Sequence, residues 1–167
     1  MIQLEKVSSL DKGLWRRIES HLARKDFLES VNDLGLIALI LKRYVHLPHA
    51  LRELAIEEVF EKAELQINTI FDRMLSQKKL AEDVGFDAHD FSTLIETFSS
   101  VLFGSDSFYS KTNEVFVRFK YAIGPNEVVT LLAAFIQADK KPDKLLSESL
   151  QGIQGSDLSS EELRHKL

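Results

Sequence analysis

The sequence predicts an all-α fold, on three observations. Apolar residues recur at the three- and four-residue spacing of an amphipathic helix along nearly the whole chain. The alternation of apolar and polar residues that marks a strand is short and isolated. Seven glycines and three prolines among 167 residues leave few positions that interrupt a helix. With 44% apolar residues, the chain can build a core of ordinary size as one domain over residues 1–167.

Helix starts can be placed in order along the chain from residues that favour a first turn. Pro48, Pro125 and Pro142 each precede or open an amphipathic run, where the missing N–H costs little. Side chains that can cap a helix N-terminus mark the other starts, at Asp11, Asp87, Ser105 and the capping-box pair Ser159 and Glu162. Gly152 and Gly155 are placed in a polar C-terminal link. Residues 154–167 are expected to complete this link and to form a terminal capping helix.

One pattern of helix, turn and helix recurs. NEVVTLLAAFIQADKKPDKLL, residues 126–146, is typical of a first helix, a polar turn and the start of a second helix. An acidic residue followed by an apolar face occurs at Asp33, Leu34, Ile37, Ala38 and Leu41, at Asp90, Phe91, Leu94, Ile95 and Phe98, and at Glu127, Val128, Leu131, Leu132 and Phe135. The second helices open at Asp11, Pro48, Ser105 and Pro142, at intervals of 37, 57 and 37 residues. Eleven residues beyond these openers lie Leu22, Val59, Phe116 and Ile153, all apolar.

The longer interval is 37 plus 20 residues, and EKAELQINTIFDRMLSQKKL, residues 61–80, fits the excess as one inserted helix. Each helix pair has an apolar face that it buries only by stacking on its neighbours. The expected architecture is a short α-solenoid of about three to four helical hairpins with one inserted helix. An irregular helical bundle stays open as the alternative, because any amphipathic helix supplies apolar matches at i, i+3, i+4 and i+7.

The hairpin pattern has a family resemblance. An acidic residue, a helix such as DLGLIALILKRY, a short turn and a second helix such as HALRELAIEEVF resemble the heptatricopeptide-type repeats related to FAST-kinase-like and RAP-domain proteins. The likeness covers residues 4–60 and 87–153. It implies work in organelles, chiefly mitochondria, in RNA maturation and as components of ribosomes and other large assemblies. The chain departs from the family in having few repeats, an acidic balance, an inserted helix and no RAP-like domain.

Charge and composition exclude several classes of function. The formal net charge is −5, whereas a domain that binds duplex nucleic acid through phosphate contacts usually carries a positive excess. The absence of cysteine removes disulfides, thiolate zinc sites and cysteine nucleophiles. No apolar run approaches the roughly 20 residues that cross a bilayer, and MIQLEKVSSLDK lacks the features of a targeting segment. We expect a soluble chain without membrane insertion.

No constellation of residues points to catalysis, a metal or a cofactor. The glycines are scattered rather than clustered before a helix with a lysine, as a phosphate-binding loop requires. Pro48 separates His46 from His49 and breaks the helical register that two ligands on one face would need. The acidic cluster Glu57, Glu58, Glu61 and Glu64 is typical of a solvated helix face. We therefore expect no enzyme, no cofactor and no small-molecule substrate.

Two groups of residues are candidates for interaction. Basic side chains beside aromatic ones suit RNA or a partner protein, and the candidates are Trp15, Arg16, Arg17, Arg24, Lys25, Lys42, Arg43 and Tyr44. Most of the phenylalanines clustered between Phe91 and Phe119 occupy core positions of the repeat. Phe103 and Phe119 lie off the pattern, and we expect them to face the inserted helix or a partner chain.

These observations lead to two hypotheses. The first is a non-enzymatic helical-repeat module, a structural subunit that binds the protein subunits of a larger mitochondrial assembly such as a ribosome. The second is direct RNA binding in organellar RNA maturation, through the basic and aromatic candidates. The mitochondrial location follows from the resemblance alone.

Overall fold

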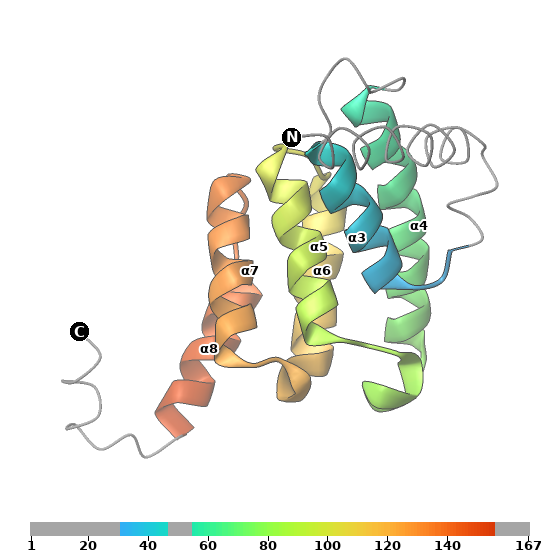
Figure 1. Ribbon diagram of the computed structural model, residues 1–167. Coiled ribbons are helices and arrows are strands. Elements are labelled where there is room, and N and C mark those ends of the chain that lie inside the picture. Colours follow the sequence, from blue (N-terminus) through green and yellow to red (C-terminus); the bar gives the residue numbers. More distant parts are fainter. Residues whose placement is uncertain (1–30, 47–54, 156–167) are drawn as a thin grey trace, which may run out of the picture.

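The structure, a computed structural model, describes residues 31–46 and 55–155 of the chain (Figure 1). Every regular element in these ranges is helical. The α-helices are α3 (Leu34–Val45), α4 (Ile56–Ser76), α5 (Ala88–Ser100), α6 (Asp106–Phe119), α7 (Pro125–Gln137) and α8 (Asp143–Gly155). Two short 3-10 helices, η2 (Glu82–Val84) and η3 (Lys120–Ala122), lie in the connections. The all-α prediction is confirmed.

The helix starts follow the capping residues of the sequence. Three side chains accept a hydrogen bond from the backbone N–H three residues further on, at N···O distances of 2.9, 2.9 and 3.1 Å, namely Asp33, Asp87 and Ser105. Each satisfies one of the N–H groups that a helix N-terminus leaves without a partner. Pro125 is the first residue of α7, as expected. The helix start predicted at Pro48 lies outside the described residues.

Two of the acidic residues expected ahead of their helices lie inside them instead. Asp33 precedes α3, but Asp90 and Glu127 are the third residues of α5 and α7. The true first-turn boundaries are set by Asp87 and Gly124. A negative charge in the first turn still interacts favourably with the helix dipole.

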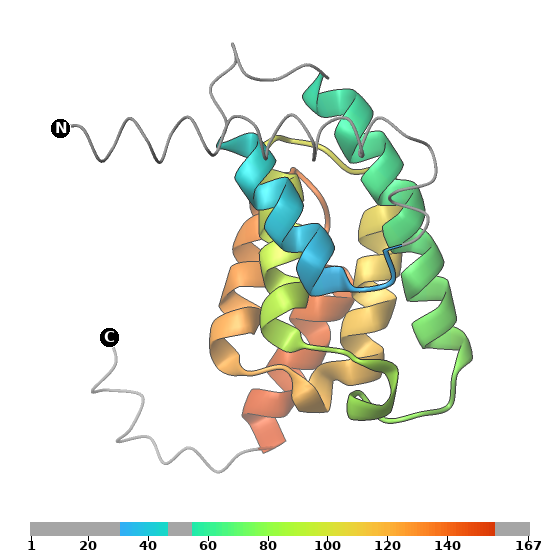
Figure 2. The same ribbon diagram turned by 45° about the vertical axis from the view of Figure 1, so that its right-hand side comes forward.

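The six helices form two layers (Figures 1 and 2). In one layer α3 packs beside α5 and α5 beside α7, and in the other α4 packs beside α6 and α6 beside α8. All three helices of the first layer run in the same direction, so their C-terminal ends share one edge of the molecule, at the top of Figure 1. This stacking of successive hairpins is the arrangement that the predicted solenoid requires.

Residues 61–80, expected as an inserted helix of their own, are part of a longer one. α4 runs unbroken from Ile56 to Ser76, so most of the extra residues lengthen the second helix of its hairpin. The connection that follows is fastened to the end of α6. Arg118 donates hydrogen bonds to the carbonyl groups of Gln77 and Lys79, at 3.3 and 3.2 Å.

The core between the layers is rich in phenylalanine. Phe98 of α5 stacks on Phe108 of α6 with ring centroids 4.4 Å apart, and Phe60 of α4 meets Phe98 edge to face at 4.8 Å. Tyr109 and Phe135 extend this contact to α7 at 5.1 Å. Most positions predicted for the first-helix face are buried, and Ile37, Leu94 and Leu131 are each 0% exposed, whereas Val128 and Leu132 are half-buried.

α5 and α7 end in the same way. Leu102, with φ 55°, and Asp139, with φ 53°, have left-handed backbone conformations and lie 37 residues apart. The next residue in each case donates its N–H to a carbonyl in the last helical turn, Phe103 to Phe98 at 3.0 Å and Lys140 to Phe135 at 2.9 Å. This is the Schellman ending of an α-helix. The 37-residue spacing of the sequence is therefore a spacing of equivalent backbone conformations.

The C-terminal prediction is partly corrected. Gly152 and Gly155 lie within α8 rather than in a polar link. The capping helix expected over the remaining residues falls at positions 156–167, outside the described residues.

Candidate functional site

The basic and aromatic candidates divide into three groups. Lys42 and Arg43 are exposed in the last turn of α3, where a positive charge favours the helix C-terminus. Tyr44 is 0% exposed, which corrects its prediction as a contact residue, because a buried ring cannot stack on a base. The remaining five, Trp15, Arg16, Arg17, Arg24 and Lys25, lie outside the described residues.

Phe103 and Phe119 are not surface anchors. Phe119 is 0% exposed, and its ring stacks on Phe86 with centroids 4.7 Å apart. Phe103 is half-buried beside Phe60 of α4, at 5.8 Å between ring centroids. Phe103 thus faces the long helix that contains the extra residues, whereas Phe119 is part of the core. The prediction of a protein interface at Phe119 is wrong.

A groove of about 340 Å³ lies where the first-layer helices end. Its lining comes from the last turns of α3, α5 and α7 and includes Lys42, Val45, His46, Glu96, Thr97, Ser100 and Gln137. Thr97 and Ser100 donate their hydroxyl hydrogens to carbonyls of α5, both at 2.7 Å. These hydroxyls are engaged by their own helix, and the charged or titratable side chains in the lining are Lys42, His46 and Glu96.

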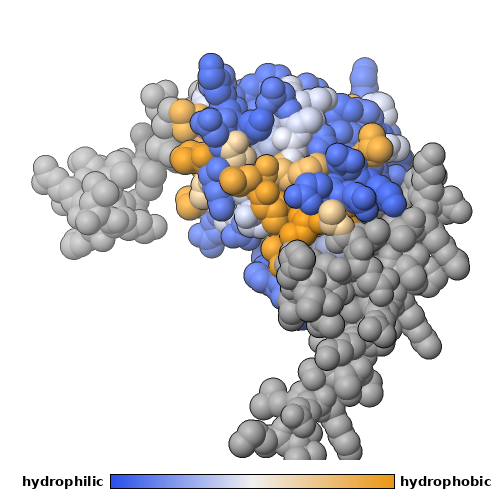
Figure 3. Space-filling view, turned by 90° about the horizontal axis from the view of Figure 1, so that it is seen from above, coloured by the Kyte–Doolittle hydropathy of each residue, from blue (hydrophilic) through white to orange (hydrophobic). Residues whose placement is uncertain are grey.

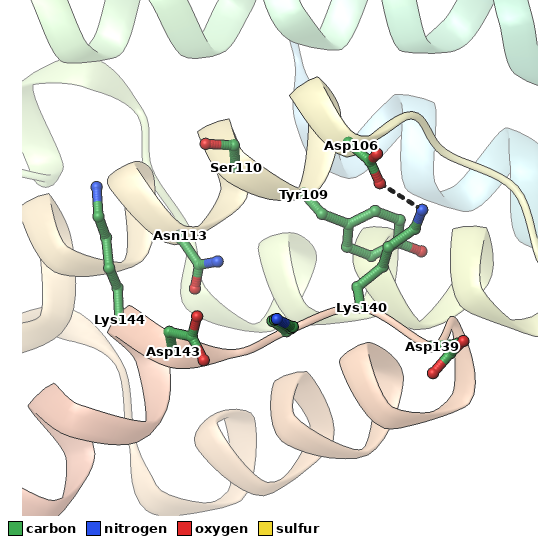
Figure 4. Close-up of a pocket in the computed structure, with 9 residues that line it drawn as sticks. Asp106, Tyr109, Ser110, Asn113, Asp139, Lys140, Asp143 and Lys144 are labelled. Carbon is green, nitrogen blue, oxygen red and sulfur yellow. Dashed lines mark hydrogen bonds and ion pairs between the residues drawn. The ribbon is translucent and has the colours of Figure 1, made fainter.

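A second cleft, of about 500 Å³, lies between α6 and the turn that joins α7 to α8 (Figure 4). Lys140 crosses it to Asp106, with Nζ 2.6 Å from Oδ1, and lies 5.8 Å from the centre of the Tyr109 ring. The hydrogen bond and charge of Lys140 hold the pKa of Asp106 below its usual range. Burial, with a smaller contribution from the charge of Glu64, raises the pKa of Tyr109 well above that of free tyrosine.

Two side chains of this cleft, Asn113 and Tyr109, bind backbone groups of neighbouring elements. Asn113 Oδ1 accepts a hydrogen bond from the N–H of Leu145 at 3.3 Å, which caps the start of α8. The Tyr109 hydroxyl donates to the carbonyl of Phe103 at 3.0 Å. Tyr109 stays neutral and is hydrogen-bonded to the backbone, so its side chain contributes to packing. Lys141 and Pro142 lie in the turn that joins α7 to α8.

One predicted solvent-facing acid has a structural contact. Glu64 of α4 accepts hydrogen bonds from both the backbone N–H of Ser105, at 3.2 Å, and the Ser105 hydroxyl. It therefore helps to hold the start of α6, whereas Glu57, Glu58 and Glu61 are exposed as expected. Within residues 31–46 and 55–155, no three side chains of the kinds that bind metals come together. In the same ranges no helix is both long and apolar enough to span a bilayer.

The flank of α5 that faces α7 shows what a hairpin buries when the next one stacks on it. Ser92, Ile95 and Ser99 are 3%, 0% and 0% exposed. Ser99 Oγ lies 3.4 Å from Gln137 Oε1 of α7. The opposite flank of α5 carries Asp90 and approaches α3. The two sides of this middle helix are thus both covered.

The equivalent flank of α7, 37 residues on, is uncovered and apolar. It carries Val129, Leu132 and Ile136; Val129 is 66% and Ile136 72% exposed, and Leu132 is half-buried. On α8, Leu146 is 46% exposed at the position equivalent to the buried Tyr109. We call these four residues, Val129, Leu132, Ile136 and Leu146, the end face. Seen from above, apolar surface emerges in separate areas among hydrophilic side chains (Figure 3).

The end face differs from the outer side of a terminal helix in a solenoid. Such helices ordinarily carry polar residues toward the solvent. The only charged residue of α7 is Glu127, which lies two positions before Val129 and so about 200° around the helix. The sequence holds a signal for this surface, because residues 128–138 contain no charge and Val129 and Ile136 are seven positions apart.

No protein-family model, curated protein or solved structure matches this chain. The relation to heptatricopeptide-type repeats stays a prediction.

Proposed function

We propose that the chain is a non-enzymatic helical-repeat interaction module that binds protein through its end face and serves as a structural subunit of a larger assembly. The observation that supports this is the exposure of Val129 and Ile136, at 66% and 72%, where the equivalent residues of α5 are covered by the next hairpin. Full burial of a valine or isoleucine side chain contributes about 1.5 to 3 kcal/mol. Covering these two largely exposed side chains would therefore contribute about 2 to 4 kcal/mol to association.

The resemblance to heptatricopeptide-type repeats supports a narrower form of the proposal. In that form the larger assembly is mitochondrial, and a ribosome is an example. The support is limited to the repeat pattern, and the two-layer stacking of α3 to α8 is compatible with it.

The assembly proposal is tested by following a tagged chain through gentle lysis. The unaltered chain should migrate with a high-mass complex, and the double substitution Val129→Glu and Ile136→Glu should release it, because two carboxylates would lose their hydration in the contact. Leu65→Glu is the matched control, since Leu65 of α4 is also 72% exposed but lies away from the end face. A monomeric profile for the unaltered chain, or equal profiles for all three proteins, would reject the proposal.

Direct RNA binding is the second candidate. The exposure of Lys42 and Arg43 at the edge of the first layer favours it, and the burial of Tyr44 removes one stacking residue. Replacing Arg16, Arg17, Lys42 and Arg43 with glutamine should abolish an affinity for single-stranded RNA that falls steeply with salt. Binding that survives the substitutions, or no binding by the unaltered chain, would reject this role.

A further inference from the structure

We propose that the end face pairs with the end face of a second copy of this chain, with α7 antiparallel to α7 of the partner around a twofold axis near Leu132. This inference rests on the proposed function, because it names the occupant of the same surface. Three observations favour a second copy, and they concern side-chain size, symmetry and charge.

The first observation is the size of the residues at the stacking positions. Between α3 and α5, the Asp90 side chain occupies the space beside Gly35, where a Cβ atom would lie 2.2 Å from Asp90 Oδ2. On the flank of α5 that meets α7, the equivalent contact uses the small residues Ser92 and Ser99. Val129 and Ile136 are larger than Ser92 and Ser99, although Ile95 of the same α5 flank is also large and 0% exposed. The end face therefore suits a wider contact made by large side chains.

The second observation is the symmetry of the apolar stripe on α7. Val129 lies three residues before Leu132, and Ile136 lies three residues after Ala133, which is itself exposed. A twofold axis between Leu132 and Ala133 places each Val129 opposite the partner's Ile136. The same axis places Leu132 opposite the partner's Ala133, so large side chains meet small ones. The contact closes on itself and produces a dimer rather than a filament.

The third observation is the distribution of charge. A twofold axis brings identical residues near each other, so a charged residue close to it would face its own copy. Residues 128–138 contain no charge. Lys140, Lys141 and Lys144 lie beyond the C-terminal end of α7, and the antiparallel arrangement moves the two lysine groups to opposite ends of the contact. Antiparallel α7 helices also oppose their dipoles favourably.

The test is sedimentation velocity of the full chain from about 1 to about 500 µM, a range that covers the affinities of small interfaces. We expect a concentration-dependent shift from monomer to dimer, with the Val129→Glu and Ile136→Glu double variant weakening association by at least about 100-fold. Leu65→Glu should associate like the unaltered chain. Circular dichroism and thermal unfolding establish that each variant is folded.

A disulfide trap places the twofold axis. The chain has no cysteine, so Ala133→Cys introduces a single thiol beside the proposed axis. Mild oxidation should link two copies of Ala133→Cys at low concentration, whereas Leu65→Cys should stay largely unlinked under the same conditions. Equal crosslinking of the two variants would overturn the proposed geometry.

The outcomes separate this inference from the proposed function. A chain that stays monomeric at every concentration overturns the dimer. If the same monomeric chain still loses a high-mass complex on Val129→Glu and Ile136→Glu, the occupant is another protein and the interaction module stands. A dimer that depends on the end face, with no larger complex in cells, supports the dimer and rejects the assembly role.

Discussion

Gly35 of α3 lies against the Asp90 side chain of α5, and replacing it with alanine tests how tight that contact is. A Cβ atom at Gly35 would lie 2.2 Å from Asp90 Oδ2 and 2.7 Å from Asp90 Cγ, well inside van der Waals contact. Inside a helix, alanine is favoured over glycine by up to about 1 kcal/mol. The obstructing atoms belong to the end of the Asp90 side chain, and turning that side chain away from its rotamer costs about 0.5 to 1.5 kcal/mol. We expect Gly35→Ala to lower the free energy of unfolding by up to about 1 kcal/mol.

The effect should change sign when the obstructing group is removed. In an Asp90→Ala background the carboxyl group is absent, so Gly35→Ala should be neutral or stabilise by up to about 1 kcal/mol. The coupling between the two substitutions is then about 0.5 to 1.5 kcal/mol. Asp90→Asn is the matched control, because it keeps the size of the side chain and removes only its charge. In that background Gly35→Ala should destabilise as it does in the unaltered chain.

Urea unfolding of the six proteins measures each of these differences. The close contact would be refuted if Gly35→Ala stabilised the unaltered chain as much as it stabilises the Asp90→Ala variant. It would also be refuted if Gly35→Ala had the same effect with aspartate, asparagine and alanine at position 90.

Three further predictions concern single side chains. Leu102→Gly should raise the free energy of unfolding by about 0.5 to 1 kcal/mol, because leucine is strained at φ 55°. Asp139→Gly should raise it less, since aspartate tolerates this conformation better. Urea unfolding measures both changes, and the opposite order would contradict this prediction. The Ala81 N–H donates a hydrogen bond to the Tyr121 hydroxyl at 2.7 Å. Tyr121→Phe should therefore lower the free energy of unfolding by about 1 kcal/mol and speed hydrogen exchange of the Ala81 amide. Unchanged exchange would count against the contact. Burial, with smaller effects from neighbouring carboxylates, raises the pKa of Asp90. The carboxylate is therefore less favourable in the folded chain than in the unfolded one, and the stability of the unaltered chain relative to Asp90→Asn should rise as pH falls through the raised pKa toward the ordinary one. A pH-independent difference between these two proteins would contradict it.

The parts of the fold that sequence predicts well depend on local periodicity. Ile37, Leu94 and Leu131 are buried because each lies on the apolar stripe of its own helix, and that stripe is visible within about two turns of sequence. Asp87 and Ser105 cap their helices through contacts only three residues long. Such features need no knowledge of distant residues.

Other features are predicted wrongly from the sequence or are missed. A boundary was expected after Phe60 because the 37-residue interval requires one, yet residues 56–76 contain neither glycine nor proline, so α4 continues. Tyr44 follows Ile37 and Leu41 at helical spacing and is buried with them, although its basic neighbours suggest a surface role. The contact of Lys140 with Asp106 spans 34 residues, and local patterns carry no sign of it.

The two-layer stacking also has a consequence for local opening of the chain. Each helix packs chiefly on the helix before and after it in its own layer, and among residues 31–46 and 55–155 the helices α7 and α8 have a layer neighbour on one side only. Loss of this last hairpin would break one set of contacts, whereas opening α5 would break two. Hydrogen exchange should therefore be slowest in α5 and progressively faster toward α8, with the stability of the fold graded along the chain rather than shared equally. A second copy held against α7 would flatten that gradient, because the last hairpin would then be packed on both sides.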